Sequence, residues 1–265
     1  MKKYLAVAAV LFKAQIVYRF NVTLTALGTV WRVIFAWILW GAIFNGRGEV
    51  GGFTLQAMLS YYLVNAFLLS MDMSWGSGRE IMDRIKGGTF SKYMVIPSNP
   101  QAHFLSQSLG TSAYYGIFGV VAAIFSALVF RIYPVFTTDP LKILMAVAMF
   151  LLGLVFMNCY QIFVGLWAFK YTDVDFLFYF LPAIVSFFRG EYFPISLLPG
   201  IFANILKFFP FTHVTYTPTM LLIGRMDRKD GLIGLIVLSV WVIGAVLLNE
   251  MTYNRLRTKY EGVGI

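Results

Sequence analysis

Charged side chains are scarce in this sequence, and their positions decide what chemistry the chain could carry. Acidic and basic residues make up only 12% of its 265 residues. One dense group lies in a polar stretch, residues 77–100, and consists of Arg79, Glu80, Asp83, Arg84 and Lys86. Three more charged residues interrupt apolar runs, where an unpaired charge is costly: Arg32, Asp72 and Glu191. Both groups are candidate functional sites.

Neither group matches a known catalytic, metal or nucleotide motif. The sequence has no G-x-x-x-x-G-K-[ST] loop, so this chain is not expected to bind ATP through a P-loop. It also lacks H-E-x-x-H and G-x-S-x-G motifs, and His103 and His213 are far apart. Asp173 and Asp175 lie in a polar turn, where we expect a solvated pair. We therefore predict no enzyme activity, no metal site and no cofactor in this chain.

The polar stretch is predicted to contain a short amphipathic helix over residues 79–86. Its apolar face consists of Ile81, Met82 and Ile85. Its charged face carries two pairs at i,i+4 spacing, Arg79 with Asp83 and Glu80 with Arg84. Such a helix is either part of a solvated loop or a docking element for a soluble partner.

Glycine and proline set the limits of this helix. Gly87-Gly88 provides a C-terminal stop, because glycine readily adopts the left-handed conformation that ends helices. Pro97 and Pro100 then prevent helical structure until Gln101. The stretch is therefore expected to form a hairpin between two apolar runs.

The composition places the chain among all-α, polytopic membrane proteins. Hydrophobic residues make up 59% of it, and its mean hydropathy is +0.75. The net charge of +9 is expected to reflect basic loops that face anionic lipid, not nucleic acid. The single cysteine, Cys159, lies in an apolar run and is expected to be a buried packing residue.

Six apolar segments are predicted to span the membrane within a single transmembrane domain, residues 1–265. They are residues 22–44, 53–75, 104–130, 141–169, 174–188 and 231–249. Residues 1–21 begin like a signal peptide but lack a clear cleavage site, so we expect an interfacial amphipathic helix. Residues 189–224 are apolar but contain four prolines, so we expect re-entrant helices there.

The distribution of basic residues predicts the orientation. Twelve lie on the side of the termini: Lys2, Lys3, Lys13, Arg19, Arg79, Arg84, Lys86, Lys92, Lys170, Arg255, Arg257 and Lys259. Eight lie on the other side: Arg47, Arg131, Lys142, Arg189, Lys207, Arg225, Arg228 and Lys229. This bias predicts cytoplasmic termini and a cytoplasmic polar stretch in a multi-pass protein of the cell membrane, inner or plasma.

The three charges in apolar runs leave alternatives open. Arg32 either extends to the cytoplasmic headgroups or faces a polar path. Asp72 follows several polar residues in the second segment, so one face of that segment must contact protein or water. Glu191 either reaches the outer headgroups or faces a central path as part of a gate.

Two motifs make the sequence similar to ABC-2 type transporter permeases, in particular the small six-span branch whose permeases are often encoded in pairs beside an ATPase. The first motif, I-x-x-G-x-[LF]-x-x-[YL]-[LM]-x-x-P, is matched by Ile85, Gly88, Phe90, Tyr93, Met94 and Pro97. The second, G-x-x-[FI]-P-[IL]-x-x-[LM]-P, is matched by Gly190, Phe193, Pro194, Ile195, Leu198 and Pro199. The resemblance covers nearly the whole chain.

The resemblance implies the transmembrane subunit of an ATP-driven exporter. Residues 77–100 would form the loop of a cytoplasmic coupling helix that docks on an ABC ATPase. The residues that couple to the ATPase would be Arg79, Glu80, Asp83, Arg84, Lys86 and Gly88. The extracellular re-entrant segment, residues 189–224, would gate the exit. Two permease chains, identical or homologous, would assemble with an ATPase dimer that holds ATP and Mg²⁺, in contact with membrane lipids.

A different class also fits part of the pattern. An ion-coupled carrier or a channel without an ATPase would use Arg32 and Asp72 as coupling charges. The sequence shows no second broken segment to match residues 189–224, which disfavours this alternative. Co-purification of an ATPase would separate the two classes.

Overall fold

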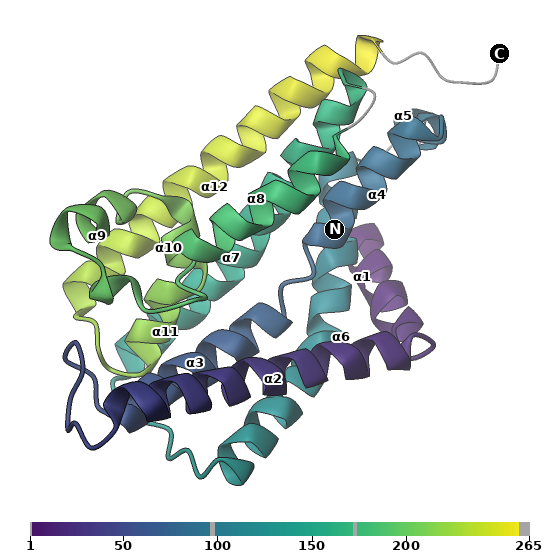
Figure 1. Ribbon diagram of the computed structural model, residues 1–265. Helices are drawn as coiled ribbons and strands as arrows, with labels where there is room; N and C mark the ends of the chain where they lie inside the picture. The colour runs from purple at the N-terminus through teal and green to yellow at the C-terminus, as the bar shows by residue number, and fades with distance from the viewer. Residues whose placement is uncertain (1, 96–98, 172–173, 260–265) are drawn as a thin grey trace.

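We describe the protein from a computed structural model, which defines residues 2–95, 99–171 and 174–259. Helices make up most of these residues (Figure 1), and an isolated bridge joins Val50 to Phe53. The first six helices are α1 Lys2–Ala14, α2 Arg19–Phe44, α3 Leu55–Ser70, α4 Trp75–Lys86, α5 Ser91–Val95 and α6 Pro100–Val129. The remaining ones are α7 Pro140–Leu166, α8 Asp175–Phe188, α9 Gly200–Leu206, α10 Pro210–Val214, α11 Tyr216–Leu222 and α12 Arg228–Leu256. The predicted all-α class is confirmed.

Within the residues that the structure describes, four helices are long and apolar enough to cross a membrane. They cover residues 20–44, 100–129, 140–169 and 228–256. The predicted segments 53–75 and 174–188 correspond to α3 and α8, which have only 16 and 14 residues. At 1.5 Å per residue these helices are roughly 24 and 21 Å long, less than the ~30 Å of a hydrocarbon core. The six-span count therefore stays a prediction.

Local capping fixes where several helices begin. Asn99 accepts hydrogen bonds from the amides of Gln101 and Ala102, and Pro100 occupies the first turn of α6. Proline suits that position because its missing N–H would have no helical partner. The helix therefore starts at Pro100, one residue earlier than the sequence predicts. Asp139 and Pro140 start α7 in the same way.

The second predicted span is wrong at its end. Helix α3 stops at Ser70, and a non-helical link, residues 71–74, leads into α4 at Trp75. Helix α4 is correspondingly longer than the helix predicted over residues 79–86. The physical reason is tertiary, because the Asp72 carboxylate in this link pairs with Arg189 and accepts the Ser74 amide, which bends the chain.

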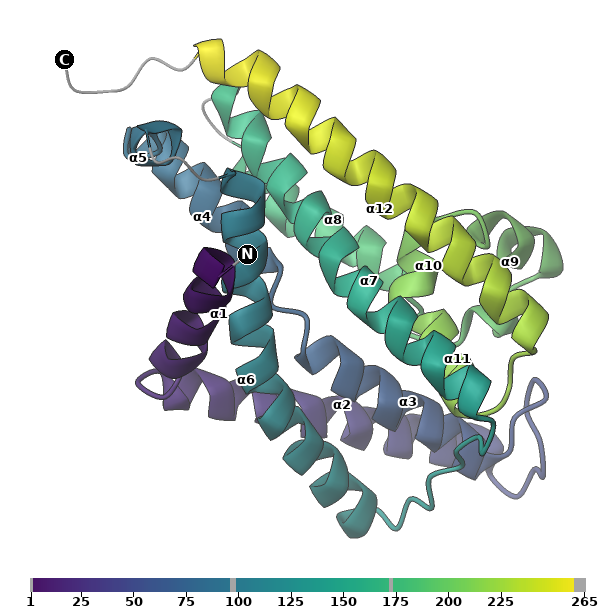
Figure 2. The ribbon, with the colours of Figure 1, turned by 180° about the vertical axis from the view of Figure 1, so that it is seen from behind.

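The N-terminal helix is also shorter than predicted. The sequence predicts a helix over residues 1–21, whereas α1 ends at Ala14 and α2 begins at Arg19. Helix α1 packs against α6 (Figure 2), and the contact is close at Gly110. A Cβ atom on Gly110 would lie 2.2 Å from the carbonyl oxygen of Ala8. Only glycine permits this approach.

The proline-rich segment is broken into short pieces, as its sequence predicts. A 3₁₀ turn at Ile195–Leu197 precedes the short helices α9, α10 and α11. Pro194, Pro199 and Pro210 lie at the starts of these pieces, where a missing N–H is tolerated. Helices α10 and α11 pack against α7, beside α12 (Figure 1).

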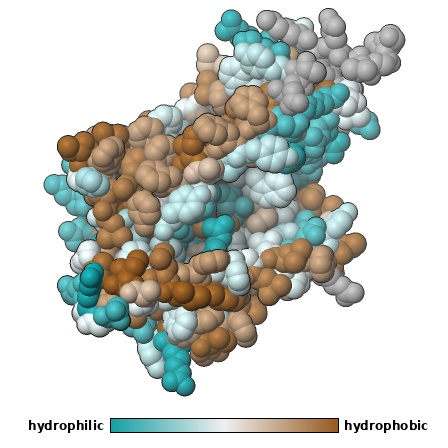
Figure 3. Space-filling view, in the orientation of Figure 1, coloured by the Kyte–Doolittle hydropathy of each residue, from teal (hydrophilic) through white to brown (hydrophobic). Residues whose placement is uncertain are grey.

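The packed helices place polar surface at the ends of the molecule. Helices α7 and α12 run side by side, and α2, α3 and α6 form a second group (Figures 1 and 2). Hydrophilic side chains gather near α4 and at the opposite end, whereas hydrophobic ones cover much of the surface between them (Figure 3). This distribution fits a protein whose middle lies in lipid.

Candidate functional site

Helix α4 is held against the helical bundle by its apolar face. Ile81, Met82 and Ile85 are buried, with 1%, 1% and 6% of their surface exposed. They pack in a cluster that includes Phe104 on α6 and Ile162 on α7. The apolar face predicted for this helix is confirmed.

A close backbone contact fixes α4 to α7. Gly78 and Gly165 face each other, and a Cβ atom on Gly165 would lie 2.5 Å from the carbonyl oxygen of Gly78. A Cβ atom on Gly78 would lie 2.4 Å from the carbonyl oxygen of Gln161. The backbones of α4 and α7 are therefore in direct contact at these glycines.

The charged face of α4 carries one of the two predicted pairs. Arg84 Nε donates to Glu80 Oε1 at 2.8 Å, and the Arg84 guanidinium lies 5.3 Å from the ring centre of Tyr93. Helix α4 ends at Lys86, and Gly87 is its C-cap. The next residue, Gly88, has a φ of +69°, a left-handed conformation that favours glycine. The Glu80–Arg84 pair and the glycine stop are therefore as predicted.

The second predicted pair is replaced by contacts with α8. Arg79 lies 3.8 Å from Asp175 instead of pairing with Asp83, and its guanidinium lies over the ring of Tyr179. Lys86 Nζ lies 2.7 Å from another oxygen of Asp175. Because Asp175 is the first residue of α8, these contacts connect α4 to the start of that helix. The predicted solvated pair of Asp173 and Asp175 is not tested, because Asp173 lies outside the described residues. Pro97 of the first motif also lies outside them.

The far end of α8 carries a buried ion pair. Arg189 Nη1 lies 2.8 Å from Asp72 Oδ2, and both side chains are less than a tenth exposed. Arg189 Nε also donates to the Thr215 hydroxyl at 2.9 Å. The pair therefore joins three segments: the link after α3, the end of α8 and the residue before α11. The sequence did not identify Arg189 as the partner of Asp72, although both are charges of opposite sign in apolar surroundings.

The turn that follows α8 also contacts α2 and α3 through Glu191. Arg32 Nη1 lies 3.5 Å from Glu191 Oε2; the Glu191 side chain is 11% exposed and that of Arg32 is 52% exposed. Both line a small cavity of about 230 Å³ together with Tyr62 and Asn65 of α3. The structure thus brings together Arg32 and Glu191, which lie far apart in the sequence.

Two tyrosines in the middle of α3 hold this turn. The Tyr61 hydroxyl donates to the carbonyl of Gly190 at 2.6 Å, and the Tyr62 hydroxyl donates to the carbonyl of Tyr192. Gly190 has a φ of +69°, and a Cβ atom there would lie 2.6 Å from the Tyr61 hydroxyl oxygen. The turn that follows α8 therefore lies beside the midpoint of α3, not at its outer end.

Comparison with known families shows what kind of protein contains this arrangement. Residues 30–264 match the model of the family described as ABC-2 family transporter protein. The chain belongs to the ABC-2 family. A search of curated proteins finds no relative that matches it.

As an ABC-2 permease, the chain is a multi-pass membrane component of a transport system, and permeases of this family generally work with ATPase partners. The match starts within α2, so α1 lies before it. Both motifs that carry the resemblance occupy the regions described above. In the first, Phe90 is buried beside Phe169 and Tyr253. In the second, Gly190 forms the turn on α3.

No group of three or more His, Cys, Asp or Glu side chains suited to a metal ion occurs in the part of the chain that the structure describes. Cys159 is buried, with 4% of its surface exposed, as the sequence predicts.

Proposed function

We propose that this chain is the transmembrane subunit of an ATP-driven exporter of the cell membrane. In this proposal α4 docks on a separate ATP-binding subunit, and the permease forms the translocation path with a second permease chain. The observation that carries the proposal is the connection from α4 through Asp175 to α8, and from the end of α8 to Arg32 and Asp72. A displacement of α4 would be transmitted to the turn beside α3.

The free face of α4 is suited to a soluble partner. Trp75 is 57% exposed and, with the charged residues of the helix, borders a shallow groove. The charged residues around this groove are Arg79, Glu80, Asp83 and Arg84. Surface ion pairs contribute little to folding, so they can exchange for contacts with a partner at small cost. This combination of an exposed aromatic ring and both signs of charge favours protein docking over a solvated loop.

A second permease chain would cover an exposed charge in an apolar helix and an exposed aromatic face. Arg32 is about half exposed in the middle of an apolar helix, where a charge facing hydrocarbon is costly. On α8, an aromatic face is exposed at Phe176, Tyr179 and Phe180, with exposures of 64%, 70% and 62%. Contact with a second permease would provide polar neighbours for Arg32 and would bury these rings.

The proposed topology places both termini and α4 in the cytoplasm. Helix α4 lies at the same end of the molecule as the C-terminal end of α12 (Figure 1), and Tyr253 packs in the cluster beneath α4. A cysteine replacing Ser91 is expected to react only with a cytoplasmic reagent, and one replacing Arg228 only with an external reagent. The native Cys159 is buried, which keeps background labelling low. Labelling of both positions from one side would contradict the topology.

The docking role is tested by Glu80→Ala and Arg84→Ala in one variant. Removing this i,i+4 pair changes stability by only about 0.3–0.5 kcal/mol, so the protein should keep its membrane level. We expect transport to be lost while the ATPase still hydrolyses ATP. Arg228→Ala, which removes a surface arginine at the opposite end, is the matched control. Normal transport by the double variant would exclude the docking role of α4.

The ion pairs of Arg32 and Asp72 do not favour the alternative of a carrier or a channel. Both Arg32 and Asp72 have an opposite charge within 4 Å, so neither is a lone coupling charge. Purification of the permease from its native membrane, followed by identification of co-purifying chains, separates the alternatives. Transport by the permease alone, without any ATPase, would favour the carrier.

A further inference from the structure

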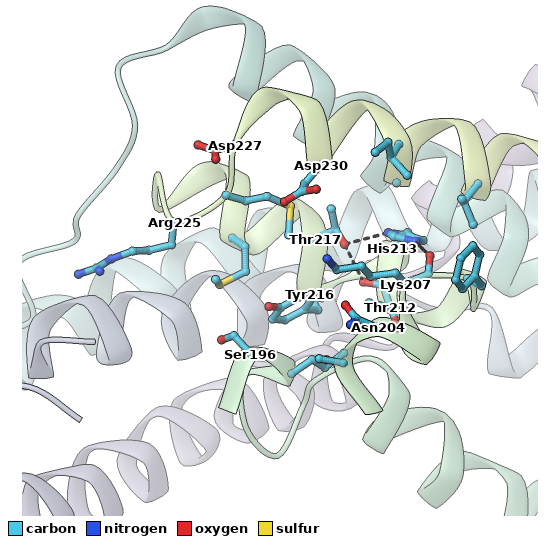
Figure 4. Close-up of a pocket in the computed structure, with 18 of the residues that line it drawn as sticks. Ser196, Asn204, Lys207, Thr212, His213, Tyr216, Thr217, Arg225, Asp227 and Asp230 are labelled. Carbon is cyan, nitrogen blue, oxygen red and sulfur yellow. Dashed lines mark hydrogen bonds between the residues drawn. The ribbon is translucent and has the colours of Figure 1, made fainter. Parts of the chain in front are cut away.

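A cavity of about 740 Å³ lies between the broken segment and the start of α12, away from the ion pairs described above. Figure 4 shows its charged and polar lining. Asp227 and Asp230 extend from the start of α12, and Lys207 extends into the cavity from the end of α9. Its volume is in the range of sites that hold drug-sized ligands.

The charges around this cavity are available to a ligand. Within the described residues, Lys207, Asp227 and Asp230 have no ion-pair partner within 4 Å. Arg225 is engaged elsewhere, because its Nη1 donates to the carbonyl of Gly52 and its guanidinium lies over Phe53. The cavity therefore has two carboxylates and one ammonium group free to bind.

His213, which also lines the cavity, is held by its own hydrogen bonds. His213 is buried, and its two ring nitrogens lie 2.9 Å from the Thr217 hydroxyl and 2.8 Å from the Lys207 carbonyl (Figure 4). A Cβ atom on Gly234 would lie 2.7 Å from His213 Nδ1, so glycine permits this packing of α10 on α12. The charged groups that can recognise a ligand are therefore Lys207, Asp227 and Asp230.

The wall that α12 contributes below the charges is apolar. Ile233 and Val237 line the cavity on this helix, and Phe208, which is 73% exposed, also lines it. From Asp227 to Val237 the helix rises about 15 Å, half of a ~30 Å hydrocarbon core. In the topology proposed above, the charges would lie at headgroup depth and the apolar wall would extend along one leaflet.

We propose that this cavity binds one phospholipid of the outer leaflet whose headgroup carries a phosphate and a primary amine. The phosphate pairs with Lys207, and the ammonium donates hydrogen bonds to Asp227 and Asp230. An acyl chain lies along Ile233 and Val237. This site goes beyond coupling to an ATPase and relies only on the topology proposed above.

The charge pattern distinguishes this headgroup from other lipids. An anionic glycerol headgroup has no cation for the two carboxylates, which repel its phosphate. A choline headgroup has a cation but no N–H donors, so it forms no charge-assisted hydrogen bond with them. Phosphatidylethanolamine matches both signs of charge and supplies three donors.

The test measures lipid binding to the purified full-length permease by native mass spectrometry. The delipidated protein receives equal amounts of phosphatidylethanolamine, phosphatidylcholine and phosphatidylglycerol. We expect one phosphatidylethanolamine to be retained, with an affinity about tenfold or more above that for phosphatidylglycerol. Lys207→Gln and Asp230→Asn should each abolish this preference, whereas Lys229→Gln, a neighbouring charge that does not line the cavity, should preserve it. Equal retention of the three lipids, or equal loss in the control variant, would overturn the proposal.

A second measurement uses the unaltered cavity and so does not depend on variants that fold poorly. Trp241 donates its indole N–H to the carbonyl of Phe208, next to the apolar wall. Phosphatidylethanolamine with brominated acyl chains should quench the fluorescence of Trp241. The contribution of Trp241 is obtained by subtracting the quenching measured in the Trp241→Phe variant. Successive N-methylation of the headgroup should weaken quenching stepwise, and quenching insensitive to methylation would refute the assignment. Neither measurement needs an ATPase, so a failed coupling proposal would leave both results unchanged.

Discussion

Ion pairs occur at both ends of α8, but their surroundings differ. At its start, Asp175 contacts Arg79 and Lys86, and all three side chains are about a third exposed. At its end, Arg189 and Asp72 are less than a tenth exposed. Exposed pairs contribute roughly 0–1 kcal/mol and are exchanged easily, whereas a buried charge that loses its partner is strongly destabilising. The comparison indicates an adjustable contact at the α4 end of this helix and a fixed anchor at the other end.

The anchor predicts the largest effect. Replacing Asp72 by Ala leaves the Arg189 guanidinium buried without its carboxylate, so we expect a loss of about 3–5 kcal/mol in the free energy of unfolding. Thermal or denaturant unfolding of the purified protein measures this loss. A double variant, Asp72→Leu with Arg189→Met, should be destabilised much less than the sum of its single changes. A loss below about 1 kcal/mol for Asp72→Ala would show that the pair is not an anchor.

The Arg32–Glu191 pair predicts an intermediate effect, because one partner is half exposed and the other is nearly buried. Glu191→Gln should change stability by about 1 kcal/mol or less. If the pair favours one conformation of the path by that amount, the ratio of conformations changes about fivefold, and transport should change similarly. Glu49→Gln, an exposed loop glutamate, is the matched control. An unchanged transport rate at equal membrane level would remove Glu191 from the mechanism.

The adjustable contact predicts a smaller effect on stability. Asp175→Asn weakens the contacts of α8 with Arg79 and Lys86, and the exposure of these groups limits the loss to less than about 1 kcal/mol. Transport per ATP hydrolysed should nevertheless fall, since α4 and α8 are no longer joined by charge. Asp175→Glu keeps the charge and should restore coupling. If Asp175→Asn left coupling intact, the path from α4 through α8 would be incorrect.

The smallest effect is expected at the end of the molecule opposite α4. A hydrogen bond from Arg228 holds the pKa of the Asp139 carboxyl below its ordinary value of 3.8. A lowered pKa in the folded state means that the stabilisation is present above the ordinary pKa and is lost as the pH falls through the lowered one. The difference in unfolding temperature between wild type and Asp139→Asn should be constant from about pH 8 to pH 5 and shrink only below about pH 4. A difference that changed between pH 8 and pH 5 would contradict this assignment.

Local features of the polar stretch could be predicted because they depend on residues close in sequence. The apolar face at Ile81, Met82 and Ile85 follows from helical periodicity, and the Glu80–Arg84 pair follows from i,i+4 spacing. The breaks in residues 189–224 follow from proline, whose ring and missing N–H prevent a continuous helix. None of these features requires knowledge of a distant segment.

The end of the second span could not be predicted in this way. Apolar composition continues from residue 53 to Trp75, but the helix stops at Ser70 because Asp72 meets a partner 117 positions away. The failed Arg79–Asp83 pair has the same origin, since Asp175 of α8 is a competing anion. Spacing identifies which residues can pair, but not which of several partners is nearest.

The sequence by itself determined the all-α membrane class of the protein, the amphipathic helix of the polar stretch and the family motifs. These depend on hydropathy and on contacts between near neighbours, which any copy of the chain carries before it folds. Tertiary structure alone decided that Asp72 meets Arg189, that Arg32 meets Glu191, and that Lys207 faces the start of α12 across a cavity. Each of these depends on the position of a turn or a chain end relative to a distant helix. Such positions result from the packing of all the helices together, which no local pattern encodes.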